Sequence, residues 1–254
     1  MGIDVAAPLT LRQLEDHLWA SADLFRGLTD VEVQRDYVLA LLFFRRASDV
    51  YEEETAAAIE ELGDIERAKE IIEANLDAYH DLRIPEGATW DEVIRTDPDR
   101  LGTALNDALR SIASANPRQL AGVFDYTDFN NRKALPPENL AQVVRHFDAL
   151  GPLTKARVPP DMLGQAYEWL IAKFAAAAGK AGGEFYSPEP VGVLGARLLA
   201  PPPEATAYDP TCGSGGLLLH LREEAFRLHG NRARALTLFG QELKPTTWAI
   251  ARMN

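Results

Sequence analysis

The chain has 254 residues, 46% of them hydrophobic and 25% charged, which predicts a folded protein of one large or two ordinary domains and excludes bulk disorder. One cysteine excludes an internal disulfide, and no apolar run reaches the ~18 residues of a membrane span, so we expect a cytoplasmic protein without a membrane segment. Residues 1–150 hold 15 Lys and Arg against 29 Asp and Glu, a net charge of −14, whereas residues 151–254 hold 11 against 9, a net charge of +2. Residues 1–150 are therefore poorly suited to bind nucleic acid in general, and their negative charge favours protein partners.

Apolar residues in the first 150 positions recur with the three-and-four spacing of amphipathic helices. Helices are predicted within 10–54, with Thr10 as N-cap and Gly27 as a stop, and over 55–80, 103–115 and 138–149. The intervening segment 83–100 carries two prolines and a glycine and is predicted to be an ordered loop.

Charged and aromatic residues of this part have structural interpretations. The run Glu52–Glu54 is expected to be a solvated helix end, and Trp90 a core or interface anchor. Arg45 and Arg46 are expected to pair with acids of the same helical bundle rather than with phosphate.

Three prolines in 151–160 mark the approximate boundary between a helical domain, 1–150, and a second domain, 151–254. A helix is predicted to follow over 161–179, with Asp161 as N-cap, and a loop then leads into a further helix at 188–190. The sequence of residues 205–242 predicts a strand, a glycine-rich turn, a helix and a second strand, which is followed by an acidic residue. Another helix is predicted to begin near Pro245.

The stretch from Tyr208 to Gly216, YDPTCGSGG, supplies the turn of this unit. In open α/β sheets, ligands bind beyond the carboxyl ends of the strands, where glycines let the backbone approach and the next helix presents free N–H groups. Glu242, after the second strand, is suited to accept hydrogen bonds from two ribose hydroxyls. The turn lacks the G-x-G-x-x-G pattern, and by itself it is equally typical of a purely structural role.

Several segments, taken in order, resemble one family: TLRQLEDHLWASADLFRG, YVLALLFFRRASDVYEEE, GVFDYTDFNN, LGQAYEWLIAKFA, GKAGGEFYSP, DPTCGSGGLLL and GQELKPTTWAIARMN. Together they resemble the N-terminal part of the modification (methyltransferase) subunit of type I restriction-modification systems, which are N6-adenine DNA methyltransferases. The resemblance implies a mainly α N-terminal helical domain followed by the first half of a Rossmann-like α/β S-adenosylmethionine-dependent methyltransferase domain.

The resemblance also implies a cofactor site for S-adenosyl-L-methionine and no metal. Its methionine end would pack against Glu184, Phe185, Tyr186, Ser187 and Pro188, with Ser187 where the family usually has threonine. Asp209 and the turn Gly213, Ser214, Gly215 and Gly216 would hold the amino acid part, and Glu242 the ribose.

The family's catalytic motif, Asn-Pro-Pro followed by an aromatic residue, does not occur in this sequence. It is expected beyond Asn254, so we expect no catalytic residue in this chain and no activity from these residues alone. The whole subunit would methylate adenine N6 in DNA, with a specificity subunit, an endonuclease subunit and a second modification subunit as partners. The sequence leaves two alternatives open: a non-catalytic assembly module that binds cofactor or the specificity subunit, and a methyltransferase for proteins or small molecules.

Cys212 in the turn allows two interpretations, a nucleophile or a small residue that lets the backbone approach a ligand. A thiol nucleophile needs a neighbouring base or a lowered pKa, and the surrounding sequence indicates neither. The family accepts small residues at this position, which favours the second interpretation.

Overall fold

The computed structural model describes residues 7–25, 27–63, 65–178 and 189–253. The chain divides into two compact units, residues 1–166 and 167–254. None of the helices in the described ranges has both the length and the apolar character that a membrane crossing requires.

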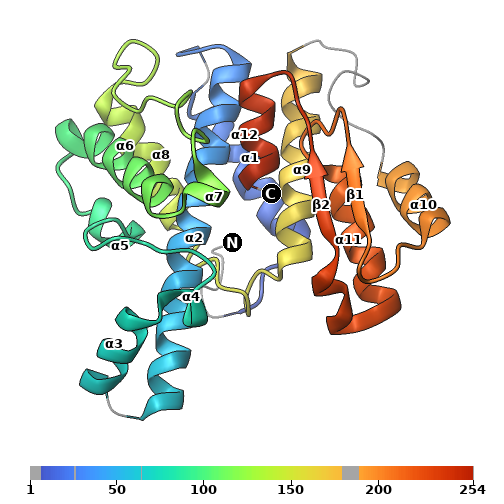
Figure 1. Cartoon of the computed structure of the whole chain (residues 1–254). Helices are drawn as coiled ribbons and strands as arrows, with labels where there is room; N and C mark the ends of the chain where they lie inside the picture. Colours follow the sequence, from blue (N-terminus) through green and yellow to red (C-terminus); the bar gives the residue numbers. More distant parts are fainter. Residues whose placement is uncertain (1–6, 26, 64, 179–188, 254) are drawn as a thin grey trace. The chain divides into compact units, whose positions relative to one another are not determined.

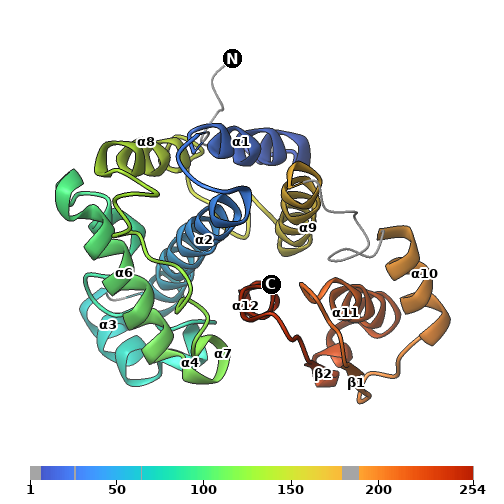
Figure 2. The ribbon, with the colours of Figure 1, turned by 90° about the horizontal axis from the view of Figure 1, so that it is seen from above.

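Every regular element described in the first unit is a helix. These helices are α1 (Leu11–Asp23), α2 (Val31–Leu62), α3 (Ile65–Ala74), α4 (Leu76–Tyr79), α5 (Trp90–Val93), α6 (Pro98–Ala115), α7 (Pro117–Leu120) and α8 (Pro137–Asp148). Figure 2 shows α2 with α1 and α8 beside it, and α6 packs on α8. The predicted loop 83–100 contains the short helix α5 and the first turn of α6.

The ends of α1 and α2 follow from local sequence signals. Thr10 caps α1 as predicted, because its side chain accepts a hydrogen bond from Gln13 N while the Gln13 side chain accepts one from Thr10 N. Helix α2 runs unbroken for 32 residues and ends at Gly63, whose φ of 79° suits a residue without Cβ. The break predicted near residue 55 is therefore wrong.

The second half of α2 stays helical because it has its own packing partner. Ala58 of α2 is buried with Ala68 and Ile72 of α3, and Figure 1 shows α3 alongside this end of α2. Residues 37–50 of α2 are all buried, and Leu41 and Leu42 among them leave no surface exposed. Such burial supplies the stability that propensity alone does not give a long helix.

A buried polar cluster on α2 holds the connection that follows α8. The Asp49 carboxylate, 5% exposed, accepts hydrogen bonds from Arg45 Nε at 2.7 Å and from Leu153 N at 2.5 Å. Arg45 also pairs with Asp148 at 2.8 Å, which confirms that it bonds to acids of its own bundle. Arg46 donates to the carbonyl oxygens of Leu153 and Val158, and its predicted pairing with an acid stays a prediction.

The acidic run on α2 holds the same connection. The Glu53 carboxylate accepts hydrogen bonds from the backbone N–H groups of Lys155 and Ala156, and Glu54 pairs with Lys155 Nζ at 2.6 Å. The interpretation of Glu52–Glu54 as a solvated helix end is wrong, because the run lies inside α2 and two of its carboxylates bind the chain after Leu150.

The second unit contains a small parallel sheet with helices against it. Its elements are α9 (Pro160–Ala177), which begins in the first unit, α10 (Glu189–Leu199), β1 (Thr206–Asp209), α11 (Gly216–His229), the 3-10 helix η2 (Gly230–Ala235), β2 (Thr237–Gly240) and α12 (Pro245–Met253). Helix α9 begins one residue before the predicted N-cap Asp161, so that residue lies in its first turn.

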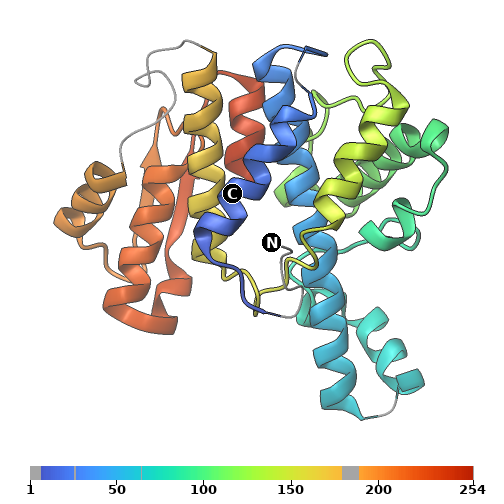
Figure 3. The ribbon, with the colours of Figure 1, turned by 180° about the vertical axis from the view of Figure 1, so that it is seen from behind.

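Strands β1 and β2 pair in parallel, in a register that sets Thr206 opposite Thr237 and Asp209 opposite Gly240. Helix α11 connects them and covers one face of the pair, as the view from behind in Figure 3 shows, and α10 packs on α11. The predicted order of strand, turn, helix and strand over 205–242 is confirmed. Parallel pairing brings the carboxyl ends of both strands to one edge.

Candidate functional site

Two predicted acids meet at the carboxyl edge of the strand pair. Asp209 is the last residue of β1, and Glu242 follows β2 by two residues. Gln241 N donates to the Asp209 carbonyl oxygen at 2.9 Å, so the pairing of the two strands continues past β2 and keeps both acids at this edge. Both side chains are half-buried, which leaves part of each carboxylate accessible.

The carboxylate of Glu242 connects the glycine turn to the start of α12. Its Oε2 accepts a hydrogen bond from Gly213 N at 3.1 Å, and its Oε1 accepts one from Lys244 N at 2.8 Å. Asp209 Oδ1 accepts from Thr211 N at 2.9 Å and so closes the start of the turn. Carboxylates that accept backbone N–H groups form stronger hydrogen bonds than neutral acceptors do, and they fix the turn.

The turn ends where α11 begins, and a third carboxylate lies there. Gly215 is the N-cap of α11 with a φ of 88°, which side chains rarely allow. A Cβ on the next residue, Gly216, would lie 2.6 Å from Glu168 Oε1, so a side chain at this position would require the Glu168 carboxylate to move. Glu168 comes from α9 and is 7% exposed. The sequence carried one signal of it, a lone acid within the apolar stretch AYEWLI.

Cys212 is a small buried residue of the turn. Its side chain is 9% exposed, and a Cβ on Gly240 would lie 2.7 Å from its Sγ, so the thiol packs against the end of β2. Burial, followed by the negative charges of Asp209 and Glu242, raises the pKa of the thiol above its ordinary value. A raised pKa lowers the thiolate fraction, which argues against a nucleophile.

The structure brings together one of the two predicted groups of site residues. Asp209, the turn Gly213–Gly216 and Glu242 gather at the carboxyl edge of the strands. The other group, Glu184 to Pro188, lies outside the described residues. Among the described residues no group of three His, Cys, Asp or Glu side chains is arranged to hold a metal ion.

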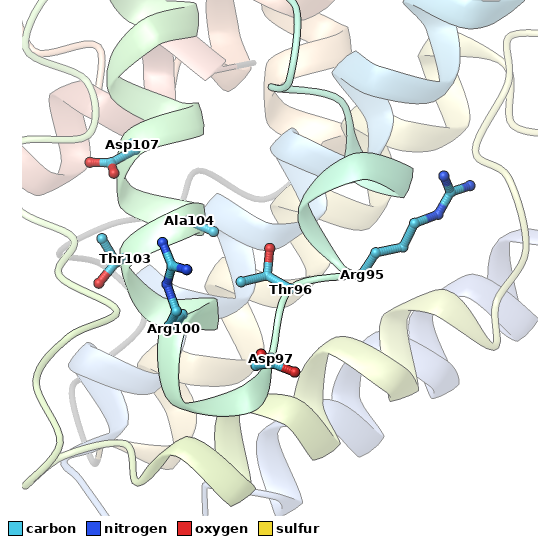
Figure 4. A pocket seen from close by; sticks show the side chains of 7 residues that line it. All are labelled: Arg95, Thr96, Asp97, Arg100, Thr103, Ala104 and Asp107. Carbon is cyan, nitrogen blue, oxygen red and sulfur yellow. The ribbon is translucent and has the colours of Figure 1, made fainter.

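A hollow of about 410 Å³ lies in the first unit. Figure 4 shows its lining, which comes from the turn after α5 and from α6: Arg95, Thr96, Asp97, Arg100, Thr103, Ala104 and Asp107. Two arginines and two aspartates offset one another there. No residue predicted to bind cofactor lines the hollow, so the carboxyl edge of β1 and β2 is the candidate site.

Two family models match successive parts of the chain. Residues 14–147 match the family model of the HsdM N-terminal domain. The chain belongs to this family. Residues 158–254 match the model of the N-6 DNA Methylase family. The resemblance to modification subunits of type I restriction-modification systems is therefore confirmed.

Curated relatives include the type I restriction enzyme MjaVIII methylase subunit of Methanocaldococcus jannaschii, 29% identical over 92% of this chain and 38% of the relative. The MpnII methylase subunit of Mycoplasma pneumoniae is 27% identical over 95% of this chain and 49% of the relative. The chain thus spans less than half the length of these two relatives.

Two solved structures are similar. The type I restriction-modification methyltransferase subunit from Streptococcus thermophilus has a TM-score of 0.72 and 28% identity, over 96% of this chain and 55% of that one. A modification subunit of a putative type I restriction enzyme from Vibrio vulnificus has a TM-score of 0.70 and 19% identity over 96% of this chain and 53% of that one, and supports the fold alone.

Proposed function

We propose that the second part of the chain, predicted as 151–254, is the front of a Rossmann-like domain that binds S-adenosyl-L-methionine. Asp209 and the turn Gly213–Gly216 would hold the amino acid part of the cofactor, and Glu242 its ribose. Glu184–Pro188 would contact its methionine end, as the family resemblance implies. Within the protein as a whole, this domain would serve the methylation of adenine N6 in DNA.

The observation that carries the proposal is the pair of half-buried carboxylates at the carboxyl ends of two adjacent parallel strands, joined through one turn. These acceptors fit the cofactor, because carboxylate oxygens accept hydrogen bonds from ribose hydroxyls and from an ammonium group. When bound, the cofactor supplies a methyl group activated on a sulfonium. The residues of this chain would bind and orient it, since the sequence contains no Asn-Pro-Pro-aromatic tetrapeptide to hold an adenine amino group.

The proposed partners follow from the type I systems to which the relatives belong. They are DNA, a specificity subunit that chooses the sequence, an endonuclease subunit and a second modification subunit. The helical part, predicted as 1–150, would contact the protein partners, because its net charge of −14 disfavours direct contact with phosphate.

The proposal is tested by calorimetric binding of S-adenosyl-L-methionine to the chain and to Glu242→Ala. The substitution removes a charged acceptor, which weakens binding by about 10-fold to 100-fold at ~1.5 to 3 kcal/mol per charged hydrogen bond. The matched control is Glu223→Ala on α11, where the side chain is 53% exposed and lies outside the turn. Equal affinities for the wild-type chain and Glu242→Ala would refute the ribose assignment.

A second candidate function is a non-catalytic assembly module. It is favoured by large apolar side chains that remain exposed in the second unit, with exposed fractions from 57% to 77% on α10: Val191, Leu194, Leu198 and Leu199. Exposed apolar patches mark contacts with other protein surfaces. A module that binds only the specificity subunit would show no calorimetric signal with S-adenosyl-L-methionine, whereas a module that also binds cofactor would show one without methyl transfer.

A further inference from the structure

Four N–H groups of the glycine turn are already bonded to acceptors of the chain itself. The Asp209 carboxylate accepts a hydrogen bond from Thr211 N, and the Glu242 carboxylate accepts one from Gly213 N. Backbone carbonyl oxygens take two more: Cys212 N donates to Gln241 O at 2.9 Å, and Gly215 N donates to Cys212 O at 2.8 Å. Turns that bind phosphate leave such groups free for the ligand. A phosphate at this turn would therefore depend on the N–H groups at the start of α11.

The start of α11, where a nucleotide phosphate would otherwise bind, lies against a side chain of α9. Glu168 Oε1 lies 2.6 Å from the position of a Gly216 Cβ, and the carboxyl carbon lies 3.5 Å from it. The side chain is 7% exposed, so the contact is shielded from solvent. Helix N-termini attract negative charge, and α11, with 14 residues, is long enough to have a substantial dipole.

We propose that Glu168 is a specificity-determining and positioning residue of the cofactor site. Its carboxylate occupies the place at the N-terminus of α11 that a phosphate takes in nucleotide-binding βαβ units, and it fixes the end of the turn. The inference deepens the function proposed above and depends on it for the identity of the cofactor. With Asp209 and Glu242, it gives the turn three carboxylates, which favour a cofactor that carries a sulfonium and an ammonium and disfavour ligands that carry phosphate.

The charge of Glu168 is tested with Glu168→Gln, which keeps the size of the side chain and removes the negative charge. Calorimetry compares S-adenosyl-L-methionine with S-adenosylhomocysteine, which has a neutral thioether in place of the sulfonium, and with inorganic pyrophosphate. We expect the preference for the sulfonium ligand to fall by about 3-fold to 10-fold, the size of one charge–charge interaction at a partly buried site. We also expect Glu168→Gln to gain binding of pyrophosphate that the wild-type chain lacks.

Two control variants separate charge from structure. Glu223→Gln makes the same change on a side chain that is 53% exposed. Both glutamates lie near His220: Glu223 is 3.3 Å from its Nδ1, and Glu168 is 3.9 Å from its Nε2. Glu223→Gln should leave all three affinities unchanged. Glu168→Asp keeps the charge and should keep the preference for the sulfonium ligand. An unchanged preference in Glu168→Gln, or no gain of pyrophosphate binding, would overturn the inference.

A measurement without ligand tests the contact itself. Gly216→Ala should lower the unfolding temperature in the wild-type chain, because its Cβ meets the Glu168 carboxylate. In a Glu168→Ala background the same substitution should be neutral or stabilising, since alanine is the better helix former. An equal loss in both backgrounds would mean that Glu168 does not occupy the start of α11.

These readouts distinguish failure of the inference from failure of the proposed function. If the wild-type chain binds no S-adenosyl-L-methionine, the proposed function is refuted. The role of Glu168 is then decided by the stability cycle and by pyrophosphate: coupling to Gly216 and a gain of pyrophosphate binding in Glu168→Gln support it, and the lack of either overturns it.

Discussion

Removal of the Asp49 carboxylate should release the connection that follows Leu150. Asp49 is 5% exposed and accepts from Arg45 Nε at 2.7 Å and from Leu153 N at 2.5 Å, so Asp49→Ala leaves two buried donors without this partner. Breaking a buried pair costs about 3 to 5 kcal/mol, and we expect the lower end, ~3 kcal/mol, because Arg45 keeps Asp148 at 2.8 Å. Burial raises the pKa of Asp49, against the opposing effect of Arg45, so a neutral acceptor should be tolerated better. Asp49→Asn should therefore lose only ~1 kcal/mol.

Urea unfolding gives the free energy, and hydrogen exchange at the Leu153 amide reports the contact directly. The matched control is Asp107→Ala, which breaks a surface pair with Arg110 at 3.9 Å, where the two side chains are 68% and 69% exposed, and should cost less than ~0.5 kcal/mol. If Asp49→Ala cost no more than Asp107→Ala, or if the Leu153 amide kept its protection, the assignment of this cluster as the anchor of the connection would be refuted.

Three further outcomes are expected. Burial lowers the pKa of His17, whose ring stacks on His146 at 3.9 Å, so the unfolded chain takes up a proton more readily than the folded chain. The contribution of neutral His17 to the unfolding free energy should therefore be complete above about pH 6.5 and should fall below that pH by at most ~1.4 kcal/mol per pH unit. His17→Gln should flatten this dependence in urea titrations from about pH 8 to 5. Cys212→Ala should leave cofactor affinity within about twofold and the wild-type thiol should alkylate more slowly than a free cysteine, because its pKa is raised; rapid labelling would revive the nucleophile interpretation. Residues 1–254, which hold no Asn-Pro-Pro motif, should transfer no tritiated methyl group to unmethylated DNA with a specificity subunit present, and clear turnover would place the catalytic group within this chain.

Local signals predicted the parts of the fold that local interactions determine. Thr10 caps α1 because the capping box needs only the residues of one turn. Asp209 and Glu242 were assigned to one site because a strand, helix and strand in parallel order bring both carboxyl ends to the same edge. The unbroken course of α2 was missed, because the burial of Ala58 depends on α3, which the apolar spacing of α2 does not reveal.

Interactions between distant segments account for the other differences. Glu53 and Glu54 were interpreted as solvated, since repulsion between neighbouring carboxylates was the only local information, whereas their partners at Lys155 and Ala156 lie about a hundred residues away in the chain. Glu168 received no role for the same reason. Its contact with Gly216 joins α9 to α11, and the sequence shows only an acid on one helix and a glycine before another.

Some acidic residues of the chain bind other groups of the chain, whereas others can also bind a ligand, and the two kinds differ in how far they are buried. In the first unit Asp49 and Glu54 are largely buried and bind a backbone N–H and an ammonium group of the chain itself, so part of the net charge of −14 is already compensated and unavailable to partners. In the second unit Asp209 and Glu242 also accept backbone N–H groups but stay half-buried. A carboxylate has about four acceptor positions, and one or two backbone hydrogen bonds leave others free. The bonds that fix the glycine turn therefore do not exhaust these two carboxylates, and the same oxygens that hold the turn remain able to accept hydrogen bonds from a ligand.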